Sequence, residues 1–272
     1  MNILIVDGNE KEASQNYLDF GIDTQYQVYS KILQKLSHNK LNISIIHPAI
    51  DKEFLPSGLS LDDFKGVVWT GSLLNIYDNT NSIKRQIDLA KSLLNKKNYI
   101  FGSCWGLHVL VTAAGGKVRK NPNGLEAIIA KDITLNINGI HHPMYKGKSK
   151  VFDSFCWHYD EAEYLPEKTI ILSSNKKSKV QSISFKKNNS NVWAVQYHPE
   201  FNPSWMSGLM RQRENILLDQ KIYKNKREFD SYKNYFSNRK KNISISISKT
   251  LTNEKFHTLE LSNWLNYIKN SN

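Results

Sequence analysis

The sequence predicts an α/β protein with a mainly parallel sheet flanked by helices, followed by a helical C-terminal extension. Short apolar runs typical of buried strands alternate with segments whose apolar residues recur at helical spacing, which favours parallel strands joined by helices. At 272 residues, 40% of them hydrophobic, the chain is long and apolar enough to form a full core. We therefore expect one large domain, or a domain with an appendage.

The N-terminal half of the chain alternates expected strands and helices. Strands are expected where apolar residues predominate, at residues 1–7, 42–48, 66–72 and 99–101. A polar loop is expected after the turn signature at residues 7–9. Apolar residues at helical spacing predict helices around residues 28–36 and 83–94, with Ser82 as the N-cap of the second. Because parallel strands present functional residues at their carboxyl ends, the site is expected at that edge of the sheet.

In the second half of the chain, short β-rich segments and then helical segments replace the alternation of strands and helices. Short β-rich segments predict a meander of strands flanking the parallel core, at residues 117–119, 127–136, 150–155, 169–174 and 181–186. Residues 205–235 are expected to be helical, with Arg213 and Glu214 on exposed faces. Residues 242–248 alternate like a strand, and residues 259–268 predict a closing amphipathic helix. We expect one domain over residues 1–202 and a helical extension over residues 203–272 that packs on it.

The stretch after the fourth strand has the pattern of a nucleophile turn. Gly102 and Gly106 flank Cys104 at the G-x-nucleophile-x-G spacing of a sharp strand-to-helix turn. Small residues are needed there because the turn folds neighbouring backbone tightly against itself. The turn places the sulfur at the N-terminus of the following helix, where unpaired N–H groups and the helix dipole favour a thiolate.

A second motif ends the strand-like run at residues 192–200. A thiol nucleophile needs a base to take its proton and an acid to orient the imidazole of that base. His198 and Glu200 stand two positions apart at the end of this run, so they point the same way. Cys104, His198 and Glu200 are therefore the candidate catalytic residues.

Together, the stretches FGSCWG (residues 101–106) and QYHPE (residues 196–200) resemble the class I glutamine amidotransferase family, the triad type found in GMP synthase and carbamoyl-phosphate synthase. The resemblance covers roughly residues 1–202 and implies a flavodoxin-like α/β fold with a mainly parallel sheet. It also implies an enzyme whose Cys104–His198–Glu200 triad hydrolyses the side-chain amide of glutamine through a γ-glutamyl thioester and releases ammonia.

Two other functions stay open beside this one. A γ-glutamyl peptidase would share the thioester chemistry but release an amine or an amino acid. A regulatory or ammonia-supplying subunit would work with a separate synthetase, and the chain itself has no S-G-G-x-D-S stretch of the kind found in the synthetase half of GMP synthase. The sequence leaves these functions as alternatives.

The resemblance also implies a set of substrate contacts. Many family members carry Gln four residues after the nucleophile, where this chain has His108, which we expect to contact the substrate. His158 lies in a segment resembling the H-x-D loop that faces the glutamine pocket in the family, and it is a second candidate. For the oxyanion hole, we expect the backbone N–H of Trp105 together with that of Ser72 or Gly71, Ser72 being preferred. Each such donor contributes about 3 kcal/mol to transition-state stabilisation.

Composition restricts cofactors, partners and compartment. The net charge of +12 invites a nucleic-acid interpretation, but over half of the excess lies scattered among Asn and Ser in residues 211–255. We expect a small-molecule substrate as partner, with a separate ammonia-accepting synthetase as a further possibility, and neither nucleic acid nor membrane. No complete metal-ligand or phosphate-loop pattern occurs, so no metal and no cofactor are expected. Two cysteines without a disulfide pattern, and a first strand in place of a signal peptide, predict a cytoplasmic protein.

Overall fold

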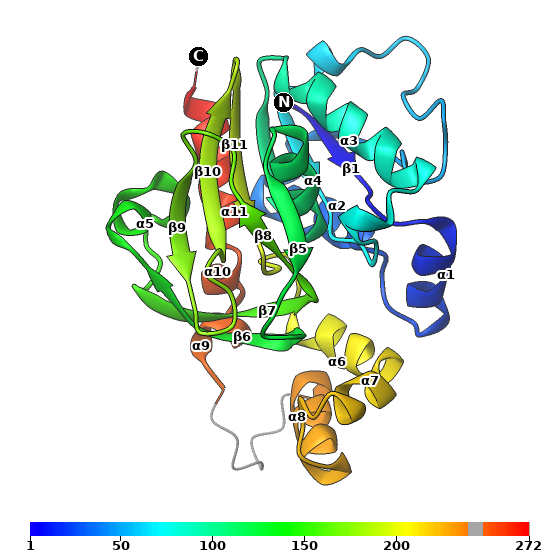
Figure 1. Cartoon of the computed structure of the whole chain (residues 1–272), viewed down its shortest axis with the longest axis vertical. Coiled ribbons are helices and arrows are strands. Elements are labelled where there is room, and N and C mark those ends of the chain that lie inside the picture. The colour runs from blue at the N-terminus through cyan, green and yellow to red at the C-terminus, as the bar shows by residue number, and fades with distance from the viewer. Residues whose placement is uncertain (239–246, 272) are drawn as a thin grey trace.

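The computed structural model describes residues 1–238 and 247–271, and within these ranges nine strands form one mixed sheet of order β2-β1-β3-β4-β11-β10-β9-β6-β7 (Figure 1). Its strands are β1 (Asn2–Val6), β2 (Asn42–Ile46), β3 (Gly66–Trp69), β4 (Tyr99–Ser103), β6 (Glu126–Leu135), β7 (Val151–His158), β9 (Ile170–Ser174), β10 (Ser182–Lys187) and β11 (Ser190–Val195). The strands from β2 to β11 in this order are parallel, and the later ones pair antiparallel. This arrangement confirms the predicted α/β class, and the predicted meander after residue 126 forms the antiparallel half of the same sheet.

Helices cover both faces of the parallel half. The helices are α1 (Lys11–Asp19), α2 (Gln25–Leu36), α3 (Asn81–Leu94), α4 (Trp105–Ala113), α5 (Ile137–His141), α6 (Pro203–Gln212), α7 (Glu214–Asp219), α8 (Lys226–Asn238), α9 (Lys249–Thr252), α10 (Glu254–His257) and α11 (Leu259–Asn270). In β1, Ile3 and Ile5 share a core with α2 and α11, whereas Leu4 and Val6 share one with α3 and α4. The alternation of side chains along a strand therefore supplies both cores of a three-layer arrangement.

Two local expectations were wrong. Residues 11–19 form α1 rather than a polar loop; Tyr17 is the one residue of this polar helix that is buried, so its sequence carries little helical periodicity. The N-cap of α3 is Thr80, whose side chain accepts the N–H of Ile83, and Ser82 instead donates to Glu10 at 2.6 Å. A further two-stranded sheet pairs β5 (Lys117–Lys120) with β8 (Asp160–Tyr164), and β8 was not predicted.

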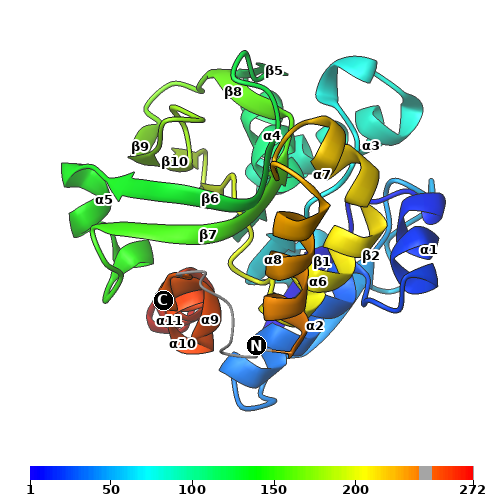
Figure 2. The same cartoon turned by 90° about the horizontal axis from the view of Figure 1, so that it is seen from below.

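The C-terminal residues divide into two groups of helices (Figure 2). The predicted helical segment 205–235 consists of α6, α7 and α8, which pack with β6 and β7 around a third apolar cluster. The predicted closing helix is α11, and Trp264 and Ile268 pack on the sheet so closely that a Cβ on Gly66 would lie 3.0 Å from each of them. Residues 242–246 of the expected strand lie outside the described residues. The domain boundary at residue 202 stays a prediction.

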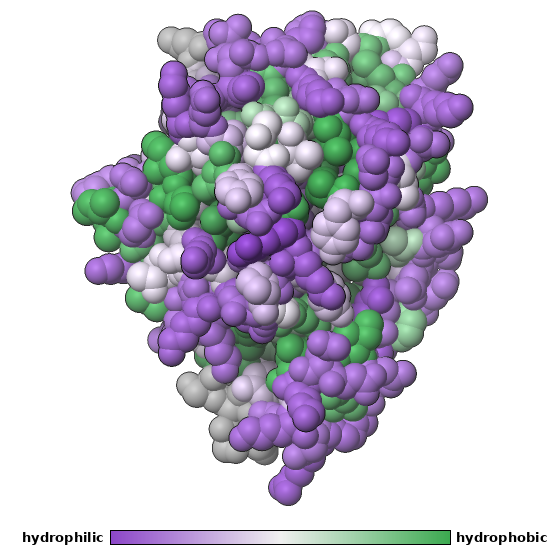
Figure 3. Space-filling view, viewed as in Figure 1, coloured by the Kyte–Doolittle hydropathy of each residue, from purple (hydrophilic) through white to green (hydrophobic). Residues whose placement is uncertain are grey.

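Hydrophilic side chains predominate on the face drawn in Figure 3, with smaller hydrophobic patches between them. Of the helices within the described ranges, none combines the length and the apolar character needed to cross a membrane.

Candidate active site

Cys104 lies on a strained turn between β4 and α4. Its φ of 50° and ψ of −103° are unusual for a residue with a side chain, and such strain costs on the order of 1–3 kcal/mol. The flanking glycines permit the turn: a Cβ on Gly102 would lie 2.8 Å from the carbonyl carbon of Gly106, and one on Gly106 would lie 2.7 Å from the carbonyl oxygen of Trp69. The geometry agrees with the strand-to-helix turn predicted from the glycine spacing.

The thiol of Cys104 is held inside the protein. Its side chain is 4% exposed, and Sγ donates to the carbonyl oxygen of Trp157 at 3.4 Å. Burial raises the pKa of Cys104 to about 12, although the backbone N–H of Trp105 lowers it. The expectation that the helix N-terminus favours a thiolate therefore captured only the smaller of two opposing effects. A base is needed to remove the proton from such a thiol.

His198 and Glu200 form a buried pair next to this turn. Nδ1 of His198 donates to Oε1 of Glu200 at 2.6 Å, and the same carboxylate oxygen accepts the hydroxyl of Ser103 at 3.2 Å. Tyr29 in turn donates to Ser103 Oγ at 2.8 Å. These residues meet because β4 and β11 are adjacent parallel strands whose carboxyl ends lie side by side, and the N–H of Cys104 donates to Val195 at 2.8 Å.

The C-terminal extension contacts the segment that carries His198. His257 in α10 lies with Nδ1 at 3.1 Å from the carbonyl oxygen of Pro199. Glu260 in α11 accepts the hydroxyl of Tyr197 at 2.8 Å and forms a buried ion pair with Lys148 at 2.9 Å. No motif marks these contacts in the sequence, because they join residues more than fifty positions apart.

Cys104 lines a cavity of about 180 Å³ at the carboxyl edge of the sheet. Its walls come from the loop after β3, from α4, from the turn between β7 and β8, and from the region of α7; they consist of Ser72, Leu73, Leu74, Asn75, His108, Trp157, His158, Tyr159, Asp160, Arg213 and Ile216. Gly71 packs against the ring of His198, since a Cβ there would lie 2.6 Å from His198 Cε1. Ser72 and the N–H of Trp105 thus lie near Cys104, and their oxyanion role stays a prediction.

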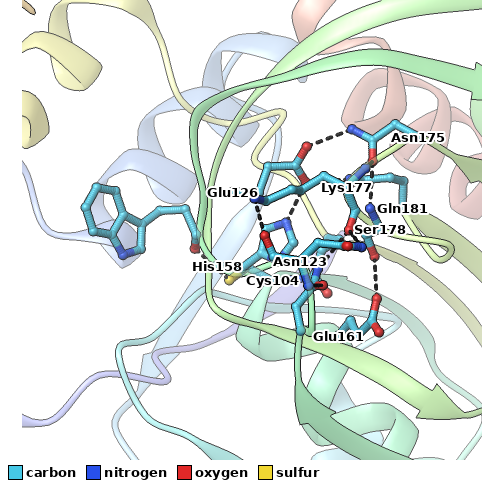
Figure 4. Close-up of polar contacts among 12 residues, drawn as sticks. Cys104, Asn123, Glu126, His158, Glu161, Asn175, Lys177, Ser178 and Gln181 are labelled. Atoms are coloured by element: carbon cyan, nitrogen blue, oxygen red, sulfur yellow. Dashed lines mark hydrogen bonds and ion pairs between the residues drawn. The ribbon is translucent and has the colours of Figure 1, made fainter. Parts of the chain in front are cut away.

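The two histidines expected at the substrate both line this cavity, but each is held by the protein. His108 Nε2 lies 2.9 Å from Oε1 of Gln196, and burial lowers the pKa of His108 to about 4, so the ring is neutral. His158 has Nε2 at 2.8 Å from Oε2 of Glu126 and Nδ1 at 2.9 Å from the carbonyl oxygen of Asp160. Figure 4 shows His158 between Cys104 and Glu126. Their substrate contacts stay predictions.

Two features of the site escaped the sequence-based interpretation. Glu126 forms the centre of a buried polar cluster, accepting from Asn175 at 2.7 Å and from Gln181 at 2.7 Å (Figure 4). The expectation that Arg213 lies on an exposed face was wrong: the residue lines the Cys104 cavity, and its Nε and Nη2 atoms are buried. Residues 205–235 do not form one continuous helix: α6 ends at Gln212, and Arg213 lies at the break before α7.

Comparisons with known proteins agree with this fold. The chain is 28% identical to a gamma-glutamyl-L-1-hydroxyisopropylamide hydrolase of Pseudomonas sp. over 98% of this chain and 93% of that protein. It is 27% identical to gamma-glutamyl peptidase 5 of Arabidopsis thaliana over 65% of this chain and 69% of that protein. A crystal structure of a glutamine amidotransferase from Thermotoga maritima shares the fold with a TM-score of 0.70 and 15% identity, covering 100% of this chain and 99% of that one. The model of the family described as glutamine amidotransferase class-I matches residues 20–214, most of the chain, and the protein belongs to this family.

Proposed function

We propose that the protein is a cysteine-dependent amidohydrolase that cleaves the γ-amide bond of glutamine or of a related γ-glutamyl compound. Cys104 is the nucleophile, His198 the base and Glu200 the residue that orients the base. The observation that carries the proposal is the 2.6 Å contact between His198 Nδ1 and Glu200, which is linked through Ser103 to the turn bearing Cys104. This contact leaves Nε2 of His198 available for a proton.

The reaction proceeds through a covalent thioester. The thiol proton of Cys104 passes to Nε2 of His198 while the sulfur bonds to the γ-carbonyl carbon. The tetrahedral intermediate then collapses: its C–N bond breaks, and His198 returns the proton to the departing ammonia or amine. A water molecule cleaves the thioester, with His198 taking its proton, and releases glutamate and the free thiol. Because the pKa of Cys104 is about 12 in the folded protein, proton removal and attack must be closely coupled.

Backbone donors stabilise the oxyanion in this proposal. The N–H of Trp105 already lies near the sulfur, as its lowering effect on the pKa of Cys104 indicates. The loop after β3 lines the same cavity with Ser72 and supplies the second donor. Hydrogen bonds aimed at the developing negative charge contribute more to the transition state than to the bound substrate.

The two buried cysteines allow a matched test. Both Cys104 and Cys156 are free and buried, so Cys104→Ala and Cys156→Ala are comparable changes. We expect Cys104→Ala to abolish hydrolysis of γ-glutamyl substrates and the glutamyl-enzyme seen by mass spectrometry after acid quenching. Cys156→Ala should keep both, since Cys156 lies in an apolar core. Turnover that survives in Cys104→Ala would overturn the proposal.

A γ-glutamyl peptidase is the second candidate within the same chemistry. His108 occupies the position where many members of the family carry a Gln that holds the substrate, and two relatives are named for γ-glutamyl hydrolysis. A screen of the purified protein against glutamine and γ-glutamyl dipeptides decides between the two. A dominant glutaminase activity would favour ammonia release, and any step that consumes the ammonia would then belong to a separate synthetase chain.

A further inference from the structure

An arginine that lines the Cys104 cavity has two buried nitrogen atoms without a hydrogen-bond partner among the described residues. Arg213 stands at the junction of α6 and α7, where its backbone N–H donates to Leu209 at 3.0 Å. Its Nε and Nη2 atoms are buried and have no hydrogen-bond partner among residues 1–238 and 247–271. Burying donors of a charged group in this way costs free energy unless an acceptor is supplied. A guanidinium presents its donors as a planar fork that matches a carboxylate.

Among the described residues, Arg213 forms no ion pair, and the acids nearest to it have other hydrogen-bonding partners. The neighbouring acid, Glu214, pairs with Lys226 at 2.5 Å. Across the cavity, Asp160 accepts the hydroxyl of Tyr77 at 3.0 Å. The guanidinium carbon lies 5.9 Å from the centre of the Trp157 ring, whose carbonyl oxygen accepts from the Cys104 thiol. The aromatic ring therefore holds the cation in the same wall that carries the reactive sulfur.

A second indication comes from Tyr159, another residue of the cavity wall. Burial raises the pKa of Tyr159, and the charge of Arg213 acts against that rise. The charge of Arg213 therefore reaches Tyr159, and both residues line the cavity. An anionic group bound in this cavity would meet a positive charge at Arg213 and the nucleophile at Cys104.

We propose that Arg213 binds the α-carboxylate of the γ-glutamyl group while Cys104 attacks its γ-carbonyl. A γ-glutamyl group carries this carboxylate at the end remote from the reacting carbonyl, whichever amine is released. One arginine therefore selects glutamine and γ-glutamyl amides alike and excludes amides without the carboxylate. This inference rests on the proposed function and specifies the chemical group that the site requires.

The test uses two chromogenic substrates that differ only in the carboxylate: γ-glutamyl-p-nitroanilide and γ-aminobutyryl-p-nitroanilide. Wild-type protein is compared with Arg213→Gln, Arg213→Lys and the control Arg211→Gln. Arg211 is an exposed arginine two positions away whose Nη2 donates to the carbonyl oxygen of Phe20. Thermal unfolding of each variant checks folding, and Arg213→Gln should not lower the melting temperature, because two of its donors have no partner among the described residues.

We expect Arg213→Gln to lower kcat/KM for γ-glutamyl-p-nitroanilide by roughly 10- to 100-fold, the range of a charge-assisted hydrogen bond. Arg213→Lys should recover part of that loss, since it keeps the charge without the fork. The slow hydrolysis of γ-aminobutyryl-p-nitroanilide and all kinetics of Arg211→Gln should stay unchanged. An equal fall for both substrates would overturn the proposal in favour of a structural role.

A second substrate pair separates the two carboxylates that a γ-glutamyl peptide carries. If Arg213→Gln affects γ-glutamylglycine but leaves γ-glutamylglycinamide unchanged, the arginine binds the leaving group, and the α-carboxylate assignment is wrong. We expect both peptides to be affected equally, because both retain the α-carboxylate.

A labelling experiment keeps this inference distinct from the proposed function. A diazoketone analogue of glutamine alkylates the nucleophile without turnover, and mass spectrometry reports its rate at Cys104. Absence of labelling in the wild type would contradict the proposed function itself. Labelling that is equally fast in wild type and Arg213→Gln would overturn only the role of Arg213; we expect roughly 10-fold slower labelling in the variant, with the reaction of Cys104 with iodoacetamide unchanged.

Discussion

Two buried histidine–glutamate pairs lie near Cys104, and they differ in how their ring nitrogens are used. In the first, His198 contacts Glu200 through Nδ1 at 2.6 Å, and Nε2 has no hydrogen-bond partner among the described residues. In the second, His158 contacts Glu126 through Nε2 at 2.8 Å, while Nδ1 contacts the carbonyl oxygen of Asp160 at 2.9 Å. Burial and the presence of an acid are the same in both pairs.

The two pairs differ in whether both ring nitrogens of the histidine already have a hydrogen-bond partner. A general base needs one nitrogen lone pair that faces the proton it accepts. His198 meets this condition, whereas His158 would have to give up an existing partner. Glu126 is itself held by Asn175 and Gln181, so the second pair is part of a hydrogen-bonded cluster behind the cavity wall that His158 lines. A buried His–Glu contact therefore indicates a catalytic base only when the remaining nitrogen is free.

The largest expected effect tests this distinction directly. His198→Gln should lower kcat by roughly 10⁴-fold or more, because the base is lost. His158→Gln should lower kcat by no more than about 10²-fold, the order expected when a wall shifts and the reacting groups are misplaced. Steady-state kinetics with a γ-glutamyl substrate measures both, and circular dichroism checks the fold. Comparable losses of kcat in the two variants would contradict the assignment of His198, and not His158, as the base.

The two glutamates should separate activity from stability. Glu200→Gln should lower kcat by roughly 10²- to 10⁴-fold, less than His198→Gln, because an orienting acid contributes less than the base it orients. Glu126→Gln should chiefly lower the melting temperature, since this carboxylate accepts from three side chains. Glu254→Gln, at an exposed position, serves as the control. If Glu200→Gln and Glu254→Gln had equal kinetics, Glu200 would have no role in catalysis.

The second pair should also have a signature in the pH dependence of stability. Burial alone raises the pKa of Glu126, but hydrogen bonds from His158, Asn175 and Gln181 outweigh it and hold the pKa below its ordinary value of 4.5. A carboxyl whose pKa is lowered by folding stabilises the protein above the pKa of the unfolded chain, and that contribution disappears as the pH falls through the folded value. The difference in unfolding free energy between wild type and Glu126→Gln should therefore be large at pH about 7 and shrink below pH about 4. Denaturant titrations at both values measure it, and a difference independent of pH would contradict the assignment.

The smallest expected effect concerns a third histidine, which pairs with an amide instead of an acid. His108 is neutral and contacts Gln196 at 2.9 Å, so His108→Gln exchanges one hydrogen-bonding group for another in the wall of the cavity. We expect glutaminase activity to rise relative to γ-glutamyl-peptide cleavage by several-fold, which corresponds to about 1 kcal/mol. The ratio of kcat/KM for the two substrates in both forms is the measurement. An unchanged ratio would make His108 a structural residue.

Much of this comparison could be predicted from short stretches of sequence. The glycines around Cys104 act within one turn, so local steric rules predict them. The expected strand geometry at His198 and Glu200 was wrong, because β11 ends at Val195 and both residues lie in the turn that follows it. Local periodic rules predict the alternation of strands and helices and the apolar face of α11. They fail for α1, whose sequence is polar apart from a few positions, and for the N-cap at Thr80.

Local rules therefore predict which residues are candidates for catalysis. The packing of distant segments decides the pKa of the thiol and the residues that line the cavity around it. The helix N-terminus at Cys104 is local and lowers the thiol pKa, but the burial that raises it to about 12 comes from segments distant along the chain. Arg213 lines the cavity together with Trp157 of β7, although it lies more than a hundred positions beyond the nucleophile. Burial and hydrogen-bond partners depend on which distant segments come into contact. A periodic pattern describes only one segment, so it cannot predict those contacts.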